Sequence, residues 1–317
     1  MTPLSRRPPI RPADQPRAED LRRALDIFDA TYGALPGITN GVFRETLVAQ
    51  IIDSERRVAF VRGLASRPLS ESALTSLGRS FDPLRGAILM NRRGQHDEAC
   101  WLVFLAAHFA RNGRTEWQLA GDFYNQLGGG SQWTWEEVVD APERVAIWLD
   151  RNRDRLRVSG GRFGNHRKYE SLAGSGTSGT GYAIATYVRW VGATHRALFE
   201  AAGGTSTTPE QRFSALYQSM GQVARFGRIG RFDYLSLIYK LDLADIVPDS
   251  CHLAGATGPK SGAKLLLRGS PNASARINDL EAQLLALGKT LGVSPDVLED
   301  AICNWQKSPG AYSFFSG

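Results

Sequence analysis

Apolar side chains recur at helical spacing along most of this chain, whereas the alternating pattern of a β-strand is scarce. Between residues 182 and 202, for instance, Tyr187, Trp190, Val191 and Leu198 fall on one side of a helix. The spacing returns after each turn signal, so we expect an all-α fold. Helices are predicted over residues 18–32, 42–64, 96–109, 117–127, 133–156, 182–202, 209–223, 232–243, 276–291 and 295–307, and after Gly258.

The chain has 317 residues, enough for one large domain or two ordinary ones. Residues 1–17 hold five prolines and few apolar side chains, so we expect a disordered basic arm there. Residues 18–317 then form the helical domain. Three consecutive glycines, beginning at Gly128, interrupt the helical pattern and predict a possible hinge near residues 128–131.

The cysteines and the lack of long apolar runs indicate the compartment. Cys100, Cys251 and Cys303 are odd in number, lie far apart and form no C-x-x-C pair. This argues against a disulfide framework and against a thiolate zinc site, and it favours a reducing environment. No apolar run approaches about 18 residues. We therefore expect a soluble cytoplasmic protein that does not bind membranes.

The net charge of +6 is modest, but the basic residues are clustered. Between Arg151 and Lys168, seven basic residues stand against one acid, Asp154. A solvated, charged helix face is one interpretation of this run. A second region, residues 250–276, contains no Asp or Glu, so no acid nearby in the sequence offsets its lysines. Together the two regions favour a polyanion as the partner.

The second region has the sequence of a phosphate-binding helix start. Glycines and a proline between Gly255 and Lys260 lead into an apolar run that carries more cations. Glycine lets backbone N–H groups approach a phosphate, and the helix dipole favours an anion there. The segment resembles a helix-hairpin-helix DNA-binding element, although Gly255 and Gly258 are one residue further apart than usual. Lys260, Lys264 and Arg268 are its expected DNA contacts.

Residues 165–170 have the density of polar groups that catalysis requires. Neutral donors, an imidazole, two cations, a phenol and a carboxylate lie within this segment. Such a group can hold a phosphate or pyrophosphate leaving group and supply its proton. A basic loop that contacts only the DNA backbone is the other interpretation. The expected catalytic residues are His166, Arg167 and Lys168, and the expected DNA contacts are Arg162, Asn165 and Tyr169.

A second dense stretch follows at residues 225–234. Arg225, Arg228 and Arg231 recur every third residue, with glycines between them that allow close approach of a substrate. These arginines would clamp an anion, Arg225 on the DNA and the other two in the catalytic site. Asp233 is either their ion-pair partner or a general base, and we include it among the catalytic residues.

Other polar residues have plainer explanations. Asp97 and Glu98 stand where a helix is predicted to begin, so they either stabilise that helix start or form the acidic side of an active site. His108 has no metal-ligand spacing and is expected to be a hydrogen-bonded core histidine. The loop 174–181 lacks the Gly-Lys-Ser/Thr ending of a phosphate-binding P-loop, which argues against a nucleotide hydrolase.

Several whole segments of this chain resemble one family, the alpha-glutamyl/putrescinyl thymine pyrophosphorylases. The family is associated with phages and is also described as amino-acid:DNA transferases. It is related to helical domains of 5-hydroxymethyluracil DNA kinases and distantly to helix-hairpin-helix DNA glycosylases. The likeness runs from about Leu35 to the C-terminus. The segments that carry it are 96–109, 163–170, 225–235, 255–267 and 298–309.

The resemblance implies a DNA-glycosylase-like fold and a transferase that hypermodifies a DNA base. Its substrate would be double-stranded DNA in which a kinase has pyrophosphorylated 5-hydroxymethyluracil. A free amine, an amino acid such as glycine or a polyamine such as putrescine, would displace pyrophosphate. The target nucleotide would flip out of the duplex to be reached. Because this chemistry needs cations and a base, we expect no cofactor and no metal.

Two functions from other classes stay open. A helix-hairpin-helix glycosylase would use a similar fold with water as the nucleophile and release a modified base. Asp279 follows Lys260 at about the spacing of the catalytic carboxylate in such glycosylases. A non-catalytic DNA-binding protein would need the basic surfaces but neither His166 nor Asp233.

Overall fold

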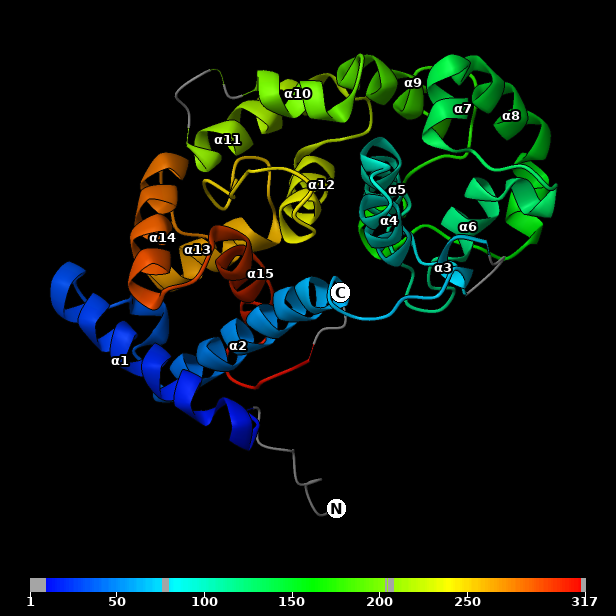
Figure 1. The fold of residues 1–317 in the computed structure, drawn as a ribbon. Coiled ribbons are helices and arrows are strands. Elements are labelled where there is room, and N and C mark those ends of the chain that lie inside the picture. Colours follow the sequence, from blue (N-terminus) through cyan, green and yellow to red (C-terminus); the bar gives the residue numbers. More distant parts are fainter. Residues whose placement is uncertain (1–9, 76–79, 203, 205–207, 315–317) are drawn as a thin grey trace. The chain divides into compact units, whose positions relative to one another are not determined.

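The computed structural model describes residues 10–75, 80–202, 204 and 208–314 of the chain (Figure 1). Every regular element in these ranges is a helix, and the one β-contact is an isolated bridge between Asn112 and Glu116. The prediction of an all-α fold is therefore confirmed. Within the same ranges, no helix combines the length and the apolar character that crossing a membrane requires.

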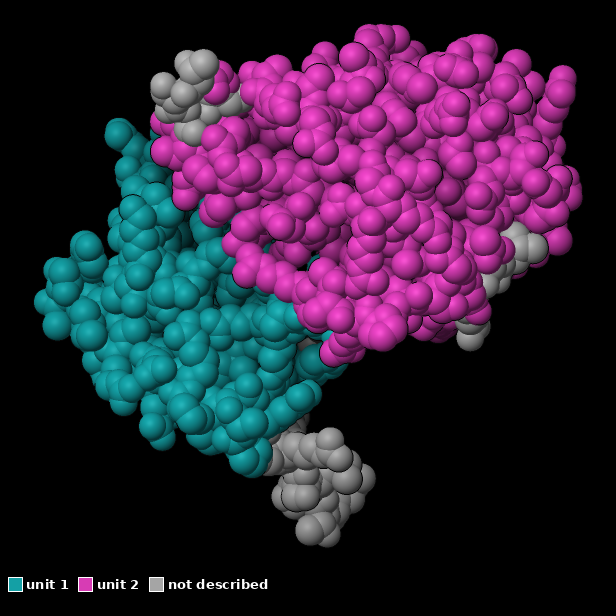
Figure 2. Space-filling model, viewed as in Figure 1, with its two compact units in different colours: residues 1–61, 248–317 teal, residues 62–247 magenta. Residues whose placement is uncertain are grey.

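The chain divides into two compact units (Figure 2). Unit 1 consists of residues 1–61 and 248–317, and unit 2 of residues 62–247. The glycines of the predicted hinge near 128–131 thus lie inside unit 2. The helix α2 (Gly41–Leu64) begins in unit 1 and ends in unit 2. The other helices of unit 1 are η1 (Pro12–Asp14), α1 (Gln15–Tyr32), η2 (Pro36–Ile38), α13 (Gly258–Arg268), α14 (Ile277–Leu291) and α15 (Pro295–Trp305).

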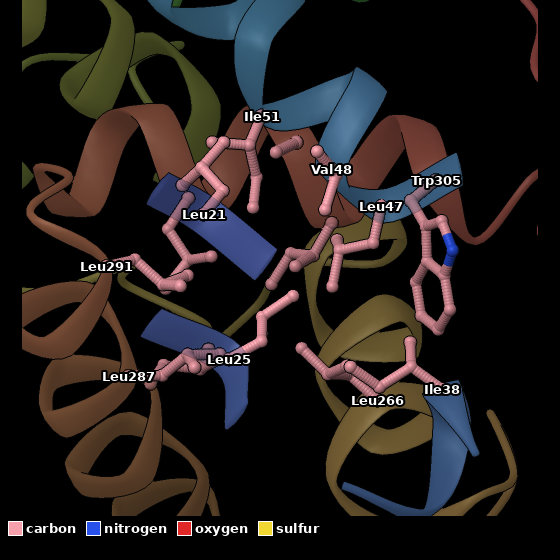
Figure 3. Packing of buried hydrophobic residues seen from close by; sticks show 14 of the residues in the cluster. Leu21, Leu25, Ile38, Leu47, Val48, Ile51, Leu266, Leu287, Leu291 and Trp305 are labelled. Atoms are coloured by element: carbon pink, nitrogen blue, oxygen red, sulfur yellow. The ribbon is translucent and has the colours of Figure 1, made fainter. Parts of the chain in front are cut away.

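Unit 1 is held by an apolar core to which all its longer helices contribute (Figure 3). Close packing of α13 depends on glycine, because a Cβ at Gly262 would lie only 2.3 Å from the carbonyl oxygen of Ile302 on α15. A Cβ at Gly37 would meet the carbonyl of Leu265 at 2.2 Å. The core residues labelled in Figure 3 are Leu21, Leu25, Ile38, Leu47, Val48, Ile51, Leu266, Leu287, Leu291 and Trp305.

The first helix begins earlier than the sequence pattern predicts. We expected it to start at Ala18, after a disordered arm, but η1 covers Pro12–Asp14 and α1 begins at Gln15. Ile10 is buried in the unit 1 core, and Arg17 pairs with Glu55 of α2. These contacts order residues whose composition alone suggested disorder. Residues 1–9 of the predicted arm lie outside the described residues.

The helix α13 begins at Gly258, as its glycine and proline predict. The residues before it, 241–257, contain no helix, and the preceding helix in the chain ends at Lys240. The described chain therefore does not confirm a helix-hairpin-helix element made of two consecutive helices joined by a short turn.

Unit 2 is built around α5 (His96–Phe109). All residues of this helix from Ala99 to Phe109 are buried, as expected of a segment that is apolar on every side. Phe104 stacks on Phe226, with ring centroids 4.8 Å apart, which fixes the start of α12 against α5. The other helices of the unit are α3 (Ser72–Thr75), α4 (Pro83–Arg92), α6 (Gln118–Tyr124), η4 (Gln126–Gly128), α7 (Trp135–Asp140), α8 (Pro142–Val158), η5 (Asn165–Arg167), α9 (Thr180–Val191), α10 (His195–Ala201), α11 (Pro209–Ser219), η6 (Met220–Gln222) and α12 (Arg228–Lys240).

Two helices that we predicted as continuous are each divided. The predicted helix 182–202 is α9 and α10, separated at Gly192, whose φ of +70° ends the first helix. The side chain of Thr194 then accepts a hydrogen bond from the Ala197 amide and begins the second. The predicted helix 133–156 is α7 and α8, which divide before Pro142 because proline favours a helix start.

Candidate functional site

The two stretches predicted to carry catalysis meet in unit 2. Arg167, at the end of η5, is 5% exposed, and its guanidinium extends to the segment before α12. Its Nη1 donates to the carbonyl oxygen of Arg225 at 2.9 Å, and its Nε donates to the carbonyl oxygen of His108 at 3.1 Å. Segments separated by about sixty positions in the sequence are thus joined through one buried side chain.

Glu170 completes this junction. One carboxylate oxygen accepts a hydrogen bond from Nε of Arg225 at 2.7 Å, and the other lies 3.7 Å from Nη1 of Arg167. Arg225 has a φ of +65°, a left-handed conformation that is uncommon outside glycine. Such strain persists where the surrounding structure fixes the residue, and here the ion pair with Glu170 does so.

The guanidinium of Arg167 also leaves no space for a side chain at Gly230 on α12. This guanidinium lies over the ring of Phe226, 4.9 Å from the centroid. A Cβ at Gly230 would come within 3.0 Å of Nη1 of Arg167 and 3.1 Å of the Phe226 ring. Burial lowers the pKa of Arg167, and the charges of Glu170 and Asp233 act against that decrease. Gly230 is therefore required for the close approach of α12 to this cation.

Asp233, on α12, is the acidic member of the cluster. Burial raises the pKa of its carboxyl above the ordinary value, and the positive charges of His166, Arg228, Lys240 and Arg167 offset part of the rise. The carboxyl thus feels positive charge from η5 and from its own helix. A carboxylate in this setting can accept a proton, and the cations around it can hold an anion.

The three arginines at intervals of three do not converge on one point. Arg225 pairs with Glu170, and the guanidinium of Arg228 lies over the ring of Phe232 at 4.6 Å. Arg231 contacts α11 instead, where its Nη1 donates to the carbonyl of Tyr217 at 3.1 Å. Helical spacing places Arg231 on a different side of α12 from Asp233. The predicted catalytic role of Arg231 stays a prediction.

The remaining predicted residues of the 162–169 segment surround this junction on the surface. Arg162, Asn165, His166, Lys168 and Tyr169 are all exposed. Beside them runs the loop 110–116, which is tied to the segment by hydrogen bonds. The side chain of Asn112 donates to the carbonyl of Phe163 at 2.9 Å, and the hydroxyl of Thr115 accepts from the Arg162 amide at 3.3 Å.

His108 is a core residue, as predicted. It is fully buried, and its Nε2 lies 3.0 Å from the hydroxyl of Thr180. Burial holds the imidazole pKa well below its ordinary value, and the charges of Arg167 and Arg225 lower it further. His108 is therefore neutral, and it helps to hold the side chain of Arg167 by hydrogen bonding.

Asp97 and Glu98 join α5 to other helices. Asp97 accepts hydrogen bonds of 2.7 Å from both the amide and Nδ1 of His195, at the start of α10. Glu98 accepts from the hydroxyl of Tyr124 at 2.7 Å and from the amide of Trp135 at 2.5 Å. The hydrogen bond from His195 lowers the pKa of Asp97, whereas burial raises that of Glu98. Neither carboxylate caps its own helix by a side-chain hydrogen bond.

A buried polar chain continues from Asp97, and sequence reasoning did not find it. Nε2 of His195 lies 2.7 Å from the hydroxyl of Tyr187, which lies 3.0 Å from the hydroxyl of Tyr234 on α12. No sequence spacing signals this chain, because its members come from four helices. Asp97 also lines a cavity of about 540 Å³, together with Met90, Gly94, Gln95, His96, Glu98, Tyr124, Gln132, Thr134, Trp135, Glu136, Thr194 and Arg196.

The Gly/Ser/Thr loop at 174–181 already holds a carboxylate. The amides of Gly174 and Ser175 donate to Asp150 of α8 at 2.8 and 2.9 Å. These N–H groups are thus occupied within the protein, in keeping with the prediction that this is no P-loop. Within the described parts of the chain, no three His, Cys, Asp or Glu side chains gather as metal ligands.

In unit 1, the predicted DNA contacts lie along one side of α13. Lys260 and Lys264 are half-buried and one turn apart, at the border of the buried side of the helix. Arg268 donates from Nη1 to Oε1 of Gln283 at 2.9 Å, so it is partly engaged within the unit. Asp279 is exposed in the first turn of α14, where its charge favours the helix start.

Comparison with known proteins identifies the family of this chain. No curated protein and no solved structure matches the chain. One family model, described as alpha-glutamyl/putrescinyl thymine pyrophosphorylase clade 3, matches residues 42–317. The match includes both stretches that meet at Arg167, the cavity at the start of α5 and the lysines of α13. Since it spans most of the sequence, the chain belongs to the alpha-glutamyl/putrescinyl thymine pyrophosphorylase family.

Proposed function

We propose that this protein transfers an amine to the 5-methylene carbon of pyrophosphorylated 5-hydroxymethyluracil in DNA. The C–O bond to pyrophosphate breaks, a C–N bond forms, and the amine loses one proton. The products are a hypermodified thymine in DNA, pyrophosphate and a proton. A 5-hydroxymethyluracil DNA kinase would supply the substrate, and a free amino acid or polyamine would supply the amine. The residues need no cofactor for these steps.

The observation that carries this proposal is the junction of residues 165–170 with residues 225–233. Exposed His166 and Lys168 lie beside it, and Arg228 adds a charge from α12. Pyrophosphate leaves readily once its charge is neutralised, which these groups would do. In this proposal Arg167 acts as a positioning residue, because its donors already bind backbone carbonyls.

Asp233 is the proposed proton acceptor. An amine attacks only in its neutral form, so a nearby carboxylate that takes its proton accelerates the reaction. Burial raises the pKa of Asp233, which makes it a better base than an ordinary surface carboxylate. The positive charges around it offset part of that rise.

Mass spectrometry of nucleosides tests the proposal. Hydroxymethyluracil DNA is treated with the kinase and ATP, then with this protein and a pool of amino acids and polyamines. We expect a nucleoside with the mass of an added amine, together with released pyrophosphate. His166→Ala and Asp233→Asn should lower the yield, whereas Arg189→Ala, an exposed arginine on α9, serves as the matched control.

Two results would replace the proposal with an alternative. Abasic sites without amine incorporation would indicate a glycosylase that acts on a modified base. DNA binding with neither product would indicate a non-catalytic DNA-binding protein. The exposed position of Asp279 offers no separate support for the glycosylase.

A further inference from the structure

Tyr169 is an aromatic side chain that the fold leaves in solvent. It is 83% exposed, more than any other aromatic side chain among the described residues. It lies between Lys168 and Glu170, directly beside the junction described above. Burying an aromatic ring is strongly favourable, so an exposed ring at this position is available to a partner.

The backbone that carries Tyr169 is fixed on both sides. The amide of Glu170 donates to the carbonyl of Arg167 at 2.9 Å, and Glu170 itself pairs with Arg225. Arg167 is anchored by its two bonds to backbone carbonyls. The ring therefore projects from a firm base, which reduces the entropy lost when it enters a contact.

One cation lies close to the ring, and other basic residues are exposed on the same segment and the adjoining loop. The ammonium of Lys168 lies 5.1 Å from the ring centroid, and Arg162 and His166 are exposed on the same segment. The adjoining loop adds the exposed side chain of Arg114. An aromatic platform bordered by cations is the arrangement that binds bases by stacking and their backbone by charge.

We propose that Tyr169 inserts into the base stack of duplex DNA and fills the gap left when the neighbouring nucleotide leaves the helix. The proposal rests on the proposed function only in taking DNA as the substrate. The nucleotide that leaves would pass toward the adjoining junction of residues 165–170 with residues 225–233. Tyr169 would thus stabilise the extruded state and make no contact with the reacting atoms.

Binding to a duplex with a preformed gap tests this role. Two labelled duplexes of the same sequence are compared by fluorescence anisotropy, one intact and one with a single tetrahydrofuran abasic analogue. We expect the full-length protein to prefer the abasic duplex. Tyr169→Ala should lower that preference by about tenfold, the usual strength of one base–aromatic stack. Affinity for the intact duplex should change little, because phosphate contacts dominate it.

Two control variants keep the test specific. Tyr169→Phe retains the ring and should retain the preference. Val158→Ala removes another side chain that is 85% exposed, near the same segment, and should also leave the preference unchanged. A preference for the abasic duplex that survives in Tyr169→Ala overturns the inference, as does its absence in the unaltered protein. If the protein prefers the abasic duplex but transfers no amine, the inference about Tyr169 holds and only the proposed reaction is overturned.

Discussion

Replacing Arg167 with alanine should chiefly lower the free energy of unfolding of unit 2, because Arg167 has a structural role. The change removes two hydrogen bonds from a charged donor to the carbonyls of His108 and Arg225. Each such bond is worth about 1.5–3 kcal/mol. The change also leaves Glu170, itself largely buried, with one cation in place of two. We therefore expect the free energy of unfolding to fall by about 3–5 kcal/mol, the range for breaking a buried charge network.

The assay is denaturant unfolding followed by tryptophan fluorescence. Every tryptophan except Trp305 lies in unit 2, so the signal reports mainly on that unit. His166→Ala is the matched control, because His166 is the exposed neighbour of Arg167 and should change stability by no more than about 0.5 kcal/mol. The variant Arg167→Ala could instead unfold at the same midpoint denaturant concentration as the unaltered protein and yet lose activity. That result would refute a structural role and assign Arg167 to the chemical step.

Three further predictions concern other residues. Replacing Lys260 and Lys264 with alanine should weaken DNA binding and reduce the slope of log affinity against log salt by roughly two, as binding titrations at several salt concentrations would reveal. Asp233→Asn should keep DNA affinity but slow amine transfer. The difference in transfer rate from the unaltered protein should become smaller at high pH, where more amine is neutral. The same difference at every pH would exclude Asp233 as the base. The folded-state pKa of Asp97 is lowered by His195, so the stability that this pair contributes is present above about pH 4 and lost as the pH falls. Unfolding curves of Asp97→Asn should therefore approach those of the unaltered protein under acid conditions, and a constant difference would contradict this assignment.

Helix positions were largely predictable from the sequence, because apolar spacing is a local property. The buried helix 96–109 and the helix start at Gly258 both lie where their residues predict. Two of the errors fall where a single residue overrides the periodic pattern. Gly192 has a positive φ, which glycine adopts readily, and ends a helix, whereas Pro142 begins a new one, although apolar residues continue on both sides.

The residue types of the candidate site were also visible in the sequence. Cations, an imidazole and carboxylates are dense at 165–170 and at 225–233, and such density is local information. What spacing could not give is the direction of each side chain. Arg167 belongs to an exposed-looking basic run but is buried, and Arg231 contacts Tyr217. Burial depends on which distant segment packs over a residue, and here that segment is the start of α12.

By itself, the sequence determined that the chain is helical, where most helices lie, and which two stretches are dense in cations and other polar groups. Only the tertiary structure decided that these stretches meet, through the bonds of Arg167 and Glu170 to Arg225. It also decided the buried chain from Asp97 to Tyr234, whose members come from four helices. Hydrogen bonds between distant segments follow from how helices pack, and no periodicity along one segment encodes them.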